Sequence, residues 1–158
     1  MTLPEGTPQP GRLLGSLELP ASMDVWDDLI GFIQTSCEQH LGDSPKSYGV
    51  LLASEELLSN MIRAASEQEI SRDSSAQIRI QCWMSEDPER NRFVIGISDT
   101  GPPFDPCLED VPEALPDVPI EKRPIGGLGL FLVKTSVDEV SYRYEEGRNS
   151  YVLSTFLV

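Results

Sequence analysis

The sequence has few basic residues and few cysteines, and both shortages exclude classes of protein. Its 158 residues include 12 lysines and arginines against 26 acidic residues, which gives a net charge of −14. Because nucleic-acid binding relies on basic patches, we exclude DNA and RNA as partners. Three cysteines without a CxxC spacing predict reduced thiols rather than a disulfide framework or a zinc site.

Long apolar runs are also missing. No stretch approaches the roughly 18–20 apolar residues that a membrane-spanning helix needs. The N-terminus shows no basic segment followed by an apolar one, so the sequence predicts no secretion signal. We therefore expect a cytoplasmic protein without a membrane partner. A chain of 158 residues is long enough to bury the core of one domain.

Apolar periodicity predicts strands and helices along most of the chain. The proline-rich residues 1–11 predict a flexible tail, and residues 12–158 predict one domain. The pattern in this domain predicts strand 13–19, helices 22–41 and 45–66, strands 78–84 and 93–99, helix 127–135, and strands 139–144 and 150–158. This order predicts an α+β two-layer sandwich, in which helices cover one face of a mixed, mostly antiparallel sheet.

The helix predicted at 45–66 carries the first candidate site. Glu56 and Asn60 are four residues apart, so they lie along one line of the helix, on the side opposite its apolar stripe. A carboxylate there can take a proton from a nucleophile, and an amide oxygen can hold a hard cation beside a phosphate. A solvated helix face explains the same spacing.

The second candidate site is the end of the strand predicted at 93–99. Asp99 is followed by Gly101 and two prolines, which fix a tight exit from the strand. A buried carboxylate at this position can accept a hydrogen bond from an exocyclic amine such as that of adenine, and glycine allows a planar base to approach the backbone. Ordinary turn chemistry explains the same residues.

The third candidate site is the glycine-rich segment GGLG at 126–129, directly before an apolar helix. Backbone N–H groups at a helix N-terminus receive phosphate, although a glycine cluster also serves as a hinge. Between the second and third sites, residues 102–124 contain seven prolines and many acids without a regular period. A loop of this length in a compact domain is usually functional or disordered.

In this order, the three segments resemble motifs of the Bergerat-fold ATPases (the GHKL, histidine kinase-like family), and within them the anti-sigma-factor serine/threonine kinases. The sequence EELLSN at 55–60 is similar to the N box, DTGPPFDP at 99–106 to the first glycine box, and GGLG at 126–129 to the second. The resemblance covers about residues 13–158, including GRN at 147–149.

The resemblance implies ATP and Mg²⁺ as cofactors. It implies that Glu56 is the general base for a serine hydroxyl on a protein substrate and that Asn60 binds Mg²⁺. It implies that Asp99 contacts adenine in a pocket shaped by Gly101. The other motif residues implied at the nucleotide are Phe104, Gly126, Gly127, Leu128 and Gly129.

The resemblance also implies a lid over ATP at about residues 105–125. This segment is strongly acidic and then ends in Lys122 and Arg123. Arg123 is the basic residue nearest the glycines, so we expect it to reach the terminal phosphate in the transition state. The acids of the lid face either solvent or a basic partner.

One departure from the family pattern lies on the helix of the first site. The family commonly has a histidine four residues after the asparagine, where this chain has Ala64, and an aromatic residue where it has Ser66. Two functions therefore stay open. The first is a kinase that phosphorylates a small STAS-domain anti-anti-sigma protein. The second is a catalytically weak or inactive nucleotide-binding module that sequesters a sigma factor or another regulator by protein–protein binding. The resemblance implies a homodimer in either case.

Overall fold

The computed structural model describes residues 11–68, 76–85, 91–110 and 127–157, so most of the predicted N-terminal tail lies outside it. The first half of the fold consists of β1 (Arg12–Pro20), the 3₁₀ turn η1 (Met23–Val25), α1 (Trp26–Leu41) and α2 (Pro45–Gln68). The second half consists of β2 (Gln77–Ser85), β3 (Arg92–Asp99), the 3₁₀ turn η3 (Leu108–Asp110), α3 (Gly127–Ser136), β4 (Glu139–Glu145) and β5 (Arg148–Phe156). The predicted order of strands and helices is confirmed, with small shifts at their ends.

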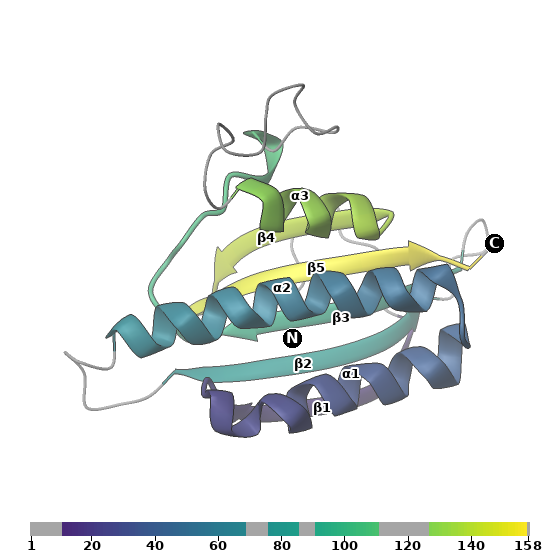
Figure 1. The fold of residues 1–158 in the computed structure, drawn as a ribbon, viewed down its shortest axis with the longest axis horizontal. Coiled ribbons are helices and arrows are strands. Elements are labelled where there is room, and N and C mark those ends of the chain that lie inside the picture. The colour runs from purple at the N-terminus through teal and green to yellow at the C-terminus, as the bar shows by residue number, and fades with distance from the viewer. Residues whose placement is uncertain (1–10, 69–75, 86–90, 111–126, 158) are drawn as a thin grey trace.

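The five strands form one sheet in the order β1-β2-β3-β5-β4, and every described pair is antiparallel rather than mixed (Figure 1). The connections explain this. Two helices, α1 and α2, join β1 to β2, so the chain returns beside β1 in the opposite direction. One helix, α3, joins β3 to β4, which gives these strands the same direction, and β5 inserts between them. The α+β two-layer fold is therefore confirmed.

The three α-helices in the described residues lie on one face of the sheet (Figure 1). The apolar stripes of the helices pack on side chains of the central strands that point toward the helices. Side chains along a strand point to the two faces of the sheet in turn, so every second residue of these strands contributes to this core. The side chains with 0% exposure that build this core include Leu29, Ile33, Ala53, Leu58, Ile78, Ile80, Cys82, Ile95, Ile97 and Val133.

Cys37 and Cys82 belong to the same core as free thiols. Burial raises the pKa of Cys37 to about 12 and that of Cys82 to about 11, so both thiols stay protonated near neutral pH. Among the described helices, none combines the length and the apolar character that a bilayer crossing requires.

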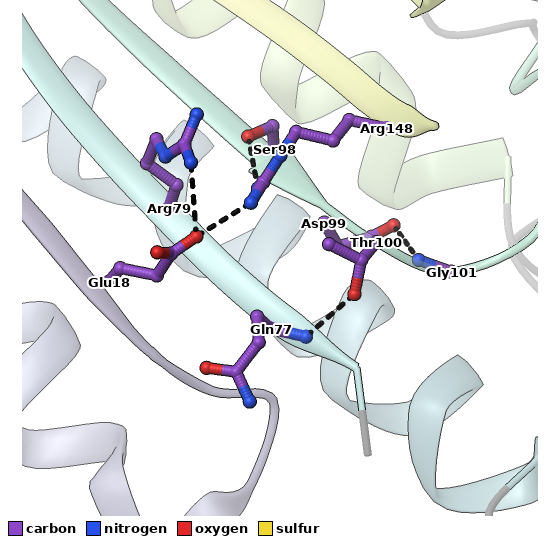
Figure 2. Close-up of polar contacts among 8 residues, drawn as sticks. All are labelled: Glu18, Gln77, Arg79, Ser98, Asp99, Thr100, Gly101 and Arg148. Atoms are coloured by element: carbon purple, nitrogen blue, oxygen red, sulfur yellow. Dashed lines mark hydrogen bonds and ion pairs between the residues drawn. The ribbon is translucent and has the colours of Figure 1, made fainter. Parts of the chain in front are cut away.

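The face of the sheet away from the helices carries an ionic network next to the candidate site (Figure 2). Arg148 of β5 donates to Glu18 of β1 at 2.6 Å and to the Ser98 hydroxyl of β3 at 3.2 Å, and Arg79 of β2 lies 3.4 Å from the same carboxylate. These contacts connect four strands directly beside the end of β3, and they lower the pKa of Glu18, chiefly through its bond to Arg148.

Candidate nucleotide-binding site

Asp99 is the last residue of β3 and is only 9% exposed. Its Oδ1 atom accepts a hydrogen bond from the Gly101 N–H at 3.0 Å (Figure 2) and another from the Asn149 amide at 2.9 Å. Among the described residues, both hydrogen bonds to this carboxylate end on Oδ1. Burial raises the pKa of Asp99 above its ordinary value, and the bonds from Asn149 and Gly101 oppose that rise.

The chain leaves β3 through a fixed exit. Thr100 extends the pairing of β3 with β2, because its N–H donates to the Gln77 carbonyl at 3.1 Å and its hydroxyl accepts from the Gln77 N–H at 2.9 Å (Figure 2). A methyl group at Gly101 would lie 3.3 Å from Asp99 Oδ1, a tight contact. The strand end predicted to hold a buried carboxylate therefore does so, and glycine is the residue that fits best after it.

Asn149 is a residue of this site that the sequence analysis missed. The sequence pattern predicts Asn149 in the turn between the last two strands, but that turn consists of Glu146 and Gly147, whose φ angles are 55° and 75°. These left-handed angles are typical of a two-residue hairpin turn of type I′. Asn149 therefore lies within β5, directly opposite Asp99. The sequence signal for this shorter turn was the dipeptide Glu146-Gly147, because a residue followed by glycine between two strands is typical of a two-residue hairpin.

The second part of the site lies between α2 and α3. A methyl group at Gly129, in the first turn of α3, would lie 2.7 Å from Glu56 Oε2. The Glu56 carboxylate therefore contacts the glycine-rich start of α3, and glycine leaves it room. Glu56 faces α3 and is half-buried, so a fully solvated helix face does not explain its spacing to Asn60.

Asn60 lies one helical turn beyond Glu56 and is also half-buried. Its Oδ1 atom accepts a hydrogen bond from the Arg63 guanidinium. No group of three or more histidine, cysteine or acidic side chains among the described residues can hold a metal ion. The donor set nevertheless fits Mg²⁺, which typically takes one or two protein oxygens together with phosphate and water. Asn60 would supply that oxygen once Arg63 releases it.

The other predicted site residues fall partly outside the described ranges. The Phe104 ring is 71% exposed, and its N–H donates to Asn149 Oδ1 at 2.9 Å. Gly127 and Leu128 begin α3 as predicted, whereas Gly126 and Arg123 lie outside the described residues. The described start of the predicted lid contains the turn η3 rather than irregular chain alone.

The two parts of the site lie toward the same end of the molecule. Figure 1 shows that the end of β3, which carries Asp99, and the start of α3, which carries Gly129, are on the same side of the fold. A buried carboxylate that can accept from a base and a helix N-terminus that can receive phosphate are therefore combined in one region. This combination suits a nucleotide, which carries both a base and phosphates, better than it suits a free base or a free phosphate.

The comparisons with known proteins agree with this geometry. Residues 19–155 match the family of histidine kinase-like ATPase domains. The match spans most of the chain and includes both parts of the site, so the protein belongs to this family and is an ATP-binding module of the GHKL type. A search of curated proteins finds no match.

Proposed function

We propose that the protein is an ATP-dependent serine/threonine kinase that phosphorylates a small STAS-domain anti-anti-sigma protein. The observation that carries this proposal is the contact between Glu56 and the first turn of α3 at Gly129. It brings a carboxylate next to backbone N–H groups of the kind that receive phosphate. A base beside the terminal phosphate is what phosphoryl transfer to a hydroxyl requires.

In the proposed reaction, the serine hydroxyl oxygen of the partner attacks the terminal phosphorus of ATP, and Glu56 accepts the hydroxyl proton. A new oxygen–phosphorus bond forms, the bond to the bridging oxygen breaks, and ADP leaves with the electron pair of that bond. Asn60 would hold Mg²⁺, and the bound ion would neutralise part of the charge of the phosphates. Asp99 and Gly101 orient the base, and Arg123 is proposed to neutralise the charge of the transferred group.

The proposed kinase role also assigns a function to the segment that follows the base pocket. Residues 105–125 are proposed to close over the nucleotide, and their acids suit a partner surface with basic residues. The proposed anti-sigma role includes three further features. They are a homodimer, a sigma factor as a second partner, and a cytoplasmic location.

The experiment is a transfer assay from radiolabelled Mg-ATP to a candidate STAS-domain protein. Glu56→Gln keeps the shape of the side chain and removes the base, so we expect transfer to fall roughly 10²–10⁴-fold, the usual contribution of a positioned base. Glu55→Gln is the matched control, because the neighbouring carboxylate is equally half-buried. Equal transfer by both variants would remove Glu56 as the base.

A second function is favoured by the contact between Arg63 and Asn60, together with Ala64 at the family's histidine position. If the arginine keeps Mg²⁺ away, the protein binds its partner without transferring phosphate. Calorimetric titration separates the two functions. A partner complex of unchanged affinity with and without ATP, in a protein whose ATP affinity does not depend on Mg²⁺, supports the binding module over the kinase.

A further inference from the structure

Asn149 is a buried polar residue, 4% exposed, at the centre of the loop that follows β3. Its amide nitrogen donates to Asp99 Oδ1 at 2.9 Å, to the Pro102 carbonyl at 2.8 Å and to the Gly101 carbonyl at 3.3 Å. Its amide oxygen accepts from the Phe104 N–H at 2.9 Å. One side chain of β5 therefore binds the start and the end of the loop and the carboxylate before it.

The chemistry of these partners fixes the orientation of the amide. The nitrogen faces three acceptors, and the oxygen faces two donors, the Phe104 N–H and the Tyr142 hydroxyl of β4. A flipped amide would place its oxygen against a carboxylate and two carbonyls. Asparagine meets both demands, whereas aspartate would add a second carboxylate beside Asp99 and alanine would leave buried groups unpaired.

The loop depends on this side chain because two of its residues are prolines. Pro102 and Pro103 have no N–H group to donate, so the loop is held through its carbonyls and through the Phe104 N–H. Two of those carbonyls and this N–H go to Asn149. The loop is thereby fixed as a unit against the start of β5.

We propose that Asn149 is the positioning residue of the base pocket. By holding the Gly101–Phe104 loop and Oδ1 of Asp99, it directs Oδ2 toward the exocyclic amine of adenine and so sets the preference for adenine over bases without that amine. This inference rests on the proposed nucleotide site but not on phosphate transfer. Asn149 acts through Asp99 and the loop, and it need not contact the nucleotide itself.

Calorimetry with ADP and IDP tests the proposal, because inosine carries a carbonyl where adenine carries the amine. We expect Asn149→Ala to weaken ADP binding about tenfold or more, as the loss of one hydrogen bond to a charged group implies, and to weaken IDP binding much less. The preference for ADP over IDP, measured as the ratio of their affinities, therefore falls. Ser150→Ala, at the next position of the same strand, is the control and keeps both affinities.

The pH profile adds a readout that general loosening of the fold would not move. The Asn149 hydrogen bond lowers the pKa of Asp99 against the effect of burial. Asn149→Ala removes it, so the pKa of Asp99 rises and ADP affinity is lost at a higher pH than in the wild type. Three other side chains interact with Asp99. Burial raises the pKa values of Tyr142 and Tyr151, so both stay neutral at acidic pH, and the third is the guanidinium of Arg148.

The outcomes separate this proposal from the proposed function. Wild-type protein that binds neither ADP nor ATP overturns both. Wild-type protein that binds ADP, with a folded Asn149→Ala variant of unchanged affinity ratio and unchanged pH profile, overturns the positioning role alone. If that variant does not fold, Tyr142→Phe removes one of the two donors to the amide oxygen, and a smaller shift of the same ratio is then required.

Discussion

Replacing Asp99 by asparagine changes one atom of the site and should separate ligand recognition from folding. Both hydrogen bonds described for this carboxylate end on Oδ1, from Gly101 and from Asn149. Asp99→Asn keeps an oxygen at that position and replaces Oδ2, the atom assigned to adenine, by an amide nitrogen. The internal contacts therefore persist, while the adenine amine meets a donor instead of an acceptor.

The size of the effect follows from the bond that is lost. A hydrogen bond to a charged group contributes about 1.5–3 kcal/mol. Its loss should therefore weaken ADP binding about 10- to 150-fold, since 1.4 kcal/mol corresponds to a factor of ten. IDP presents a carbonyl to the new amide nitrogen, so Asp99→Asn should bind IDP more tightly than the wild type does. Calorimetry with both nucleotides measures the change; a variant that still prefers ADP as strongly as the wild type refutes the assigned contact.

The same substitution should stabilise the fold in a pH-dependent way. Burial raises the pKa of Asp99, so its stabilising contribution is complete below the unfolded-state pKa and is lost as the pH rises through the raised folded-state pKa. Asp99→Asn avoids the burial of this charge at neutral pH. Its free energy of unfolding should exceed that of the wild type near pH 7, and the difference should vanish toward pH 3. Denaturant unfolding at both values measures it, and an advantage that grows toward acid contradicts the sign.

Two further predictions concern α2. A methyl group at Gly49 would lie 2.1 Å from the Ser136 carbonyl oxygen of α3, so Gly49→Ala should cost at least about 1–3 kcal/mol in denaturant unfolding. Gly31→Ala, which meets nothing within 4 Å in α1, should instead add about 0.5–1 kcal/mol, and equal changes in both variants would contradict the close helix contact. Because Arg63 donates to Asn60 Oδ1, Arg63→Ala should lower the Mg²⁺ concentration needed for half-maximal ATP binding. An unchanged or higher requirement would show that Arg63 does not compete with the ion.

The parts of the fold that depend on local pattern were predictable from the sequence. The period of apolar residues determined the order of strands and helices, because each element buries one face against its neighbours. Asp99 and the glycines at the start of α3 were found for a related reason. Their chemistry, a carboxylate at a strand end and flexible backbone at a helix start, is visible within a few residues of sequence.

The parts that depend on contacts between distant segments were not predictable. Asn149 meets Asp99 only through the register of β5 on β3, and a two-residue error in the position of the turn concealed that pair. The contact of Glu56 with α3 depends on how closely two helices approach, and the spacing of residues within α2 cannot report it. The contact of Arg63 with Asn60 is different, because it spans only three residues of α2 and the spacing could have predicted it.

The measurement that tests the central claim most directly is amide hydrogen exchange of the wild-type protein with and without saturating ATP and Mg²⁺. A nucleotide held between the end of β3 and the start of α3 should slow exchange at Gly101 and Phe104 and in the first turn of α3. Exchange in β1, at the far edge of the sheet, should stay unchanged. Unchanged exchange at both parts of the site under saturating ATP, or protection confined to another region, would contradict the account.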